Sequence, residues 1–143
     1  SKGGVNSIED NWVYLYIILE EIYDFRFFYR DLGLLLERYP DLAVRFRALV
    51  SEKRQTITHV LEALAEGDIL RLDPRLKTAL TDQIMMTVTF WLANDSIGNT
   101  HHDGPALIHK TVFQVMCLIV PYMGEAGFSA LTRMIDHYEA VID

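Results

Sequence analysis

The sequence predicts an all-α protein, folded as a single bundle of five to six helices. Apolar residues recur every three to four positions over most of the chain, which is the period of an amphipathic helix. Strand-like alternation never persists for more than a few residues, and no Asn-Gly or Asp-Gly hairpin turn lies between β-branched runs. With 143 residues, half of them hydrophobic, the chain is large enough to bury a core without disulfides or metals.

The start of the chain and its hydropathy set the domain boundaries. Ser1-Lys2-Gly3-Gly4 lacks the apolar core of a secretory signal, so residues 1–7 are interpreted as a tag remnant or linker. The helical domain is expected to span residues 8–143. The longest uninterrupted apolar run, Trp12–Leu19, is well short of the roughly 20 residues that a membrane-spanning helix needs. We therefore expect a cytoplasmic protein that does not contact a membrane.

Two helical segments are expected before residue 40. Asn6 or Ser7 caps the first, and its apolar residues have helical spacing. These residues are Ile8, Trp12, Leu15, Tyr16, Leu19 and either Ile22 or Tyr23. The second segment, residues 25–38, is expected to relax or bend at Gly33. Its apolar face consists of Phe28, Leu32, Leu35 and Leu36.

Two longer helices follow. Pro40 fits the first turn of a helix, where its missing N–H is not needed, and Asp41 lies where the helix dipole favours negative charge. This helix is expected to end at Gly67, because glycine readily adopts the left-handed conformation that ends helices. Asp73 and Pro74 predict the cap and first residue of the next helix. The two apolar stripes are Leu42, Phe46, Leu49, Val50, Ile57, Val60, Leu61 and Leu64, then Leu76, Leu80, Ile84, Val88 and Trp91.

A polar loop over residues 94–104 precedes the helix that Pro105 starts. From residue 106 to 122, apolar side chains point in nearly every direction around the helix axis, so other elements must cover most of this helix. Cys117 lies within this apolar segment and is expected to be a small core residue. After Gly124, a final amphipathic helix is expected to form a lid on the bundle.

The sequence carries no recognisable catalytic or cofactor site. Neither glycine-rich phosphate pattern, G-x-x-x-x-G-K or G-x-G-x-x-G, is present, and no nucleophile motif such as G-x-S-x-G occurs. His101, His102 and Asp103 can each ligate metal, but adjacent loop residues rarely converge on one ion, so a solvated loop with a helix cap is favoured. The formal charge of -7 opposes nucleic-acid binding by this chain alone. We expect no enzyme activity, no cofactor and no bound metal.

An ordered set of motifs resembles the C-terminal domain of one subgroup of TetR-family transcriptional regulators. The run Tyr23–Leu32 is similar to the stretch YRFFYRDL of that subgroup, and residues 39–47 resemble its NPELARRFR element. Residues 89–92 resemble its TFWL element, and residues 112–122 resemble its closing pattern VYQVLxLLAPYL. The likeness covers nearly all of residues 8–125.

The resemblance implies a regulatory domain that binds a small-molecule effector, forms a homodimer, and controls an upstream helix-turn-helix DNA-binding domain absent from this chain. Two C-terminal helices of the family usually pair with their copies in a four-helix interface. The two helices expected over residues 74–97 and 105–122 fit such an interface, because they are apolar on more than one face. A lone subunit would expose one of these apolar faces to water. The interface candidates are Leu80, Ile84, Val88, Trp91, Val112, Val115, Met116 and Ile119.

The expected effector pocket lies between the first helix, the aromatic segment, the long helix and the face that carries Met85 and Met86. Its candidate lining is Trp12, Tyr16, Tyr23, Phe27, His59, Met86 and Phe90. Because these side chains are mainly aromatic and apolar, we expect an uncharged or weakly polar effector, oriented by tyrosine hydroxyls or by His59.

Two other functions fit the same sequence. One is a purely structural dimerisation module that binds no ligand. The other, less favoured, is a helical metal-binding protein whose ligands are His101, His102, Asp103 and His109.

Overall fold

The structure is a computed structural model that describes residues 8–98 and 103–142. Within these ranges it is all-α, as the sequence predicts, and its β structure is limited to one isolated bridge between Leu70 and Met123. The elements are α1 (Ile8–Asp24), α2 (Arg26–Arg30), α3 (Leu32–Arg38), α4 (Pro40–Glu66), α5 (Pro74–Ile97), α6 (Gly104–Ile119), the 3₁₀ turn η2 (Val120–Tyr122) and α7 (Glu125–Ile142).

The segment predicted as one bent helix over residues 25–38 is two short helices, α2 and α3. The backbone leaves helical geometry at Phe25 (φ -109°, ψ 31°) and at Asp31 (φ -109°, ψ 22°). The prediction that Gly33 bends this segment is therefore wrong, because Gly33 lies inside α3. These breaks also explain why the described chain has more helices than the five to six expected.

The predicted helix ends are set by local chemistry. Asp73 and Asp103 cap α5 and α6: each carboxylate accepts a hydrogen bond from a backbone N–H three residues on, at 2.9 Å and 2.8 Å. The end of α4 differs from the prediction. Gly67 is not left-handed (φ -81°); the next residue, Asp68, has the positive φ of 62° that turns the chain. Aspartate tolerates this conformation better than most side chains do.

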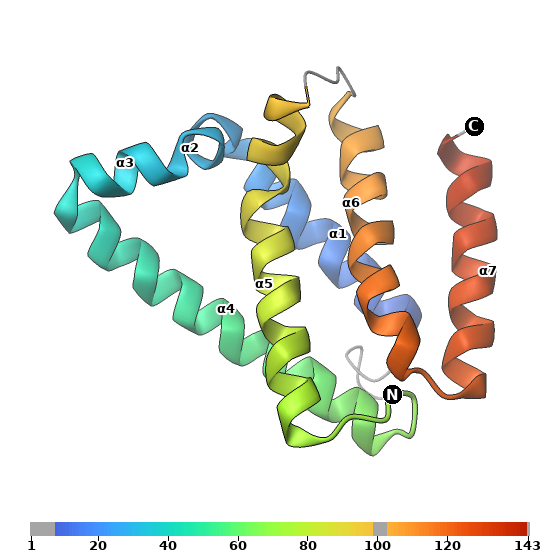
Figure 1. The fold of residues 1–143 in the computed structure, drawn as a ribbon. Coiled ribbons are helices and arrows are strands. Elements are labelled where there is room, and N and C mark those ends of the chain that lie inside the picture. The colour runs from blue at the N-terminus through green and yellow to red at the C-terminus, as the bar shows by residue number, and fades with distance from the viewer. Residues whose placement is uncertain (1–7, 99–102, 143) are drawn as a thin grey trace.

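The helices pack around α6, which contacts α1, α5 and α7 (Figure 1). In this view α5 lies beside α6, α1 crosses behind both, and α7 lies on the opposite side of α6 from α5. The long α4 contacts α5 near its C-terminal end and diverges from it toward α3. The core therefore has two parts: a tight block of α1, α5, α6 and α7, and a wider angle between α4 and α5 that α1 and α2 close.

The apolar character of α6 is explained by its central position. The stretch Gly104–Tyr122 is long and apolar enough to cross a membrane by length and composition alone. Its uninterrupted apolar runs are short, so a search for such runs does not find it. In the fold, however, it buries Val112, Val115 and Met116 against its neighbours. The prediction that Cys117 is a core residue is wrong, because its side chain is exposed. Because apolar residues lie on every side of α6, its sequence does not indicate which face remains exposed to solvent.

The N-terminal end of α6 packs so closely on α1 that a side chain at Gly104 would not fit. A Cβ there would lie 2.8 Å from Cε2 and 2.9 Å from Cζ of Tyr23. The Tyr23 ring also lies beside Trp91, with centroids 6.4 Å apart, and under the Arg26 guanidinium at 4.7 Å. Replacing Gly104 with Ala is therefore expected to lower the free energy of unfolding by about 1–3 kcal/mol, the usual cost of overpacking. Urea denaturation followed by circular dichroism measures this change.

Gly33 provides the matched control for that substitution. Nothing lies within 4 Å of a Cβ built at Gly33, in the first turn of α3. Gly33→Ala should therefore stabilise the protein by about 0.5–1 kcal/mol, because alanine restricts the unfolded chain more than glycine does. If the two substitutions changed the free energy of unfolding equally, the close contact between Gly104 and Tyr23 would not limit the size of the side chain at position 104.

Candidate ligand-binding cavity

A cavity of about 250 Å³ lies in the wide angle between α4 and α5, and α1, α2 and α6 close its other sides. The stripe predicted on the long helix faces this space. From α4 the lining consists of Phe46, Leu49, Val50, Lys53, Thr56, Ile57, Val60, Leu61 and Leu64. From α5 and α6 it consists of Ile84, Met85, Val88, Thr89, Val115, Met116 and Ile119. Most of these side chains are apolar, so the wall favours an apolar occupant.

The cavity has a closed end and an open end. Leu61, Leu64 and Ile119 line the closed end and are buried. At the other end Phe25, at 66% exposure, and the exposed Tyr14 and Leu49 line it beside Glu21 and Lys53. We call this second group of five residues the mouth. A ligand would enter here, and any polar part of it could remain in contact with water.

A few polar groups interrupt the apolar wall. Tyr29 packs against Phe28 and Phe46, with ring centroids 5.3 Å and 6.0 Å away, and burial raises the pKa of its hydroxyl above the ordinary value. The phenol is therefore neutral at pH 7 and can donate a hydrogen bond. Thr56 donates to the carbonyl oxygen of Glu52 in its own helix, at 3.2 Å. The wall thus offers few hydrogen-bonding groups to a ligand.

Two ion pairs connect α4 to α5, the helices that form two walls of the cavity. Arg54 pairs with Asp82, and the Lys77 ammonium donates to Glu62 at 2.7 Å. The hydrogen bond from Lys77 and its charge lower the pKa of Glu62. These groups are partly or largely exposed, so each pair contributes little to stability. Their position matters more, because they join the two helices whose divergence leaves the cavity open.

None of the seven residues predicted as pocket lining lies on this cavity, although the predicted helices do. Trp12 is buried in the core, the Tyr16 ring lies against the tilted His109 ring with centroids 4.8 Å apart, and Tyr23 contacts Trp91. Phe27 is exposed beneath Arg26 and Arg30, and the His59 side chain is 88% exposed beside Glu62. Met86 and Phe90 face outward at 62% and 48% exposure. Their neighbours Met85 and Thr89 line the cavity in their place.

The predicted and the observed lining residues differ by a rotation of the helix about its axis. On α1 the lining residues are Asn11, Tyr14, Leu15, Ile18, Glu21 and Ile22, a stripe offset by one position from the predicted one. One residue turns a helix face by about 100°. Since residues 12–19 are all apolar, periodicity could not select between two faces of α1. The sequence of α4 does contain a signal for the cavity. Lys53 and Thr56 occupy positions on its apolar stripe, where a fully packed helix would carry apolar residues.

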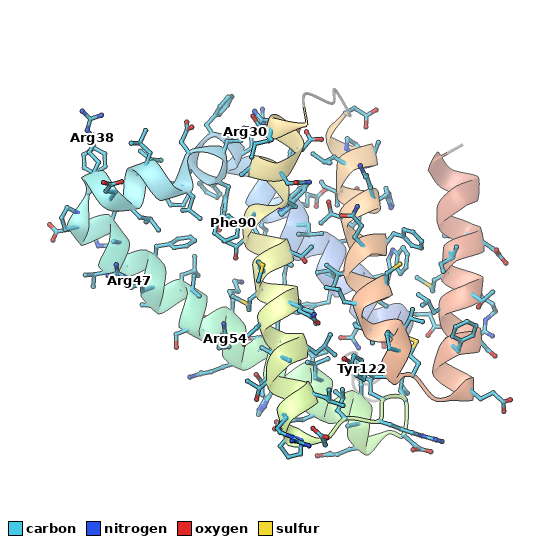
Figure 2. All side chains as sticks on the ribbon, viewed as in Figure 1. Arg30, Arg38, Arg47, Arg54, Phe90 and Tyr122 are labelled. Carbon is cyan, nitrogen blue, oxygen red and sulfur yellow. The ribbon has the colours of Figure 1, made fainter. Side chains whose placement is uncertain are left out.

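The eight predicted interface residues are all buried within the single chain. Each of Leu80, Ile84, Val88, Trp91, Val112, Val115, Met116 and Ile119 belongs to the core. These positions cannot form the contact surface with a second copy unless the bundle opens. The outward faces of α5 and α6 instead border a hollow of about 420 Å³, lined among others by Met86, Phe90, Lys110 and Gln114. In Figure 2 Phe90 lies on α5, which no other element covers in this view.

The residues proposed as metal ligands do not form a described site. His101 and His102 lie outside the described residues, and Asp103 caps α6. His109 faces Tyr16 in α1, and burial together with His137 lowers the pKa of its imidazole. Across residues 8–98 and 103–142, no three His, Cys, Asp or Glu side chains are grouped to hold an ion.

Comparison with known proteins identifies the kind of fold. Residues 1–131 match the family described as TetR, bacterial transcriptional repressor. The fold is similar to the crystal structure of a TetR-family transcriptional regulator from Marinobacter aquaeolei VT8, with a TM-score of 0.81 and 25% sequence identity over 92% of this chain. The match spans 63% of the length of that regulator. No curated protein sequence matches the chain significantly.

Proposed function

This chain belongs to the TetR family of bacterial transcriptional repressors, a non-enzymatic family, and from that premise we propose that residues 8–143 are its ligand-binding and dimerisation domain. In this proposal the domain binds a small apolar or aromatic effector. It also pairs with a second copy, and it controls DNA binding by a helix-turn-helix domain that belongs to the same protein but lies outside this chain.

The observation that supports effector binding is the cavity between α4 and α5. A space of about 250 Å³ with an apolar wall and an open mouth costs stability if it stays empty, because the side chains around it lose packing contacts. A purely structural dimerisation module would gain nothing from this cost. Concave, mostly apolar sites with a few polar groups are typical of small-molecule binding.

The outward face of α5 and α6 is the proposed dimer interface. Met86, Phe90 and Ile97 are exposed on one side of α5, and Met and aromatic residues are enriched in protein interfaces. A two-fold axis through the hollow between α5 and α6 would place the same face of a second copy over these residues and form a four-helix contact. We propose this face in place of the eight buried residues suggested by the sequence.

The regulatory mechanism follows from the position of the cavity. An effector between α4 and α5 would contact α1, α4, α5 and α6 at once, so it would favour one relative position of these helices over another. That preference can shift a two-state equilibrium only if the effector binds the two positions with different affinity. Two ion pairs, Arg54 with Asp82 and Lys77 with Glu62, cross the boundary between α4 and α5 that would move.

Filling the cavity tests the effector site. Val60→Trp places a larger side chain in the wall, whereas Val44→Trp, at an exposed position of the same helix, leaves the cavity open. Apolar probes such as 1-naphthol and 1-decanol should raise the thermal midpoint of the wild type and of Val44→Trp, because a ligand that binds the native state stabilises it. They should not raise that of Val60→Trp. If no probe shifts the wild type, the structural-module alternative replaces this proposal.

A further inference from the structure

We propose that the effector is an acidic amphiphile, whose apolar body fills the cavity and whose single carboxylate is held at the mouth by Lys53. This inference rests on the proposed function, because it assumes that the cavity is an effector site. It goes further by assigning the chemical class of the ligand and the orientation in which the ligand binds.

The volume of the cavity sets the size of the apolar body. An apolar cavity of about 150 Å³ holds one benzene ring. By proportion, a cavity of about 250 Å³ holds about ten non-hydrogen atoms. An unbranched chain of eight to ten carbons or a fused pair of aromatic rings has this size. The open mouth lets a short polar group extend beyond it.

The wall determines which end of the ligand enters first. Lys53 is the one basic residue among those that line the cavity, and it lies at the mouth. The closed end is formed by leucine and isoleucine side chains. A carboxylate buried there would lose its hydration without gaining a cation, which is strongly unfavourable. An acidic ligand must therefore bind with its apolar end inward and its carboxylate toward Lys53.

Lys53 is available for such a contact. Its side chain is half-buried and forms no ion pair with any residue in the described part of the chain. The neighbouring Arg54 differs, because it is already paired with Asp82 on α5. Glu21, the acidic residue at the mouth, is on α1 and exposed to water, so its charge is better screened than that of Lys53.

The charge distribution on the α4 side of the mouth also favours an anion. Seven of the 13 basic residues lie between residues 25 and 54, but only four of the 20 acidic residues do. This stretch covers α2, α3 and the first half of α4, and it supplies Phe25, Leu49 and Lys53 of the mouth, whereas α1, which supplies Tyr14 and Glu21, carries only acidic charged residues. Figure 2 shows Arg30, Arg38, Arg47 and Arg54 along these helices. The chain as a whole carries a formal charge of -7, so the excess of basic residues is local.

Three compounds that share one tail and differ in the head group test the inference. Isothermal titration of the protein at pH 7.5 with decanoate, 1-decanol and decylammonium compares a carboxylate, a hydroxyl and a cation. We expect decanoate to bind about 10-fold more tightly than 1-decanol, the usual gain from a hydrogen bond between charged groups. Decylammonium should bind most weakly, because Lys53 repels it.

Substitution of Lys53 identifies the residue responsible. Lys53→Met keeps the length and apolar stem of the side chain, so decanoate should lose its 10-fold advantage while the affinity for 1-decanol is unchanged. Arg47→Met removes a charge from the same helix but not from the lining, and should preserve the preference. Urea denaturation of both variants checks that each remains folded.

The outcomes separate the two proposals. If 1-decanol binds as tightly as decanoate, or if Lys53→Met keeps the preference for decanoate, the acidic-amphiphile inference is wrong and the effector site stands. The same holds if 1-naphthol binds and all three decyl compounds do not. If no apolar probe binds the wild type, the proposed effector site itself is wrong.

Discussion

Phe90→Glu is expected to convert the proposed dimer into a monomer at micromolar concentration. Phe90 is 48% exposed on α5 and borders the hollow between α5 and α6. In a two-fold interface each substitution occurs twice, so two carboxylates would lose their hydration in place of two aromatic rings. Each buried, unpaired charge costs several kcal/mol, and the dissociation constant of the dimer should rise at least about 100-fold. Sedimentation equilibrium measures this constant directly.

Phe128→Glu is the matched control for the dimer prediction. Phe128 is also a half-exposed phenylalanine, but it lies on α7, away from the face that carries Phe90. We expect this variant to dimerise with the affinity of the wild type. A wild-type monomer at micromolar concentration would contradict the proposed interface. So would a Phe90→Glu variant that remains dimeric.

Leu92→Ala is expected to cause a large loss of stability. Leu92 is completely buried, at 0% exposure, and belongs to the core around α5 and α6. Truncation removes three buried carbon atoms and leaves a new space between helices that are packed on several sides. The expected decrease in the free energy of unfolding is about 2–5 kcal/mol. Guanidinium denaturation at fixed protein concentration measures it and keeps the contribution of dimerisation constant.

An exposed leucine gives the comparison for that experiment. Leu34 lies on α3 and is largely exposed, so Leu34→Ala should change the free energy of unfolding by less than about 0.5 kcal/mol. A similar loss for the two variants would mean that the core around Leu92 is not packed as the structure describes.

The cavity shows how far periodicity alone can define a site. Its α4 wall could be predicted, because α4 has one apolar stripe and Val60 and Leu61 lie on it. Its α1 and α5 walls could not. Both helices have two adjacent apolar faces, and a rotation of one residue exchanges Met86 for Met85 and Phe90 for Thr89. Which face is turned inward depends on how much of each the neighbouring helices cover.

The sequence pattern places the dimer interface on buried residues for a related reason. The sequence indicates that α5 and α6 have more apolar surface than one stripe requires, and it therefore predicts that the most apolar positions contact a second copy. In the fold those positions, such as Val112 and Met116, form the core of one chain. The apolar residues left for a partner are exposed ones such as Met86 and Phe90, which the sequence pattern favours as pocket lining.

The sequence by itself determined the all-α class and most helix ends of this protein. Pro40, Asp73 and Asp103 act through the backbone of their own helices, and such effects depend only on nearby residues. The tertiary structure alone decided that α4 diverges from α5, that the space between them stays open, and that Lys53 lies at its mouth. These features depend on contacts between residues far apart in the chain, and no local pattern of apolar residues specifies the angle at which two helices meet.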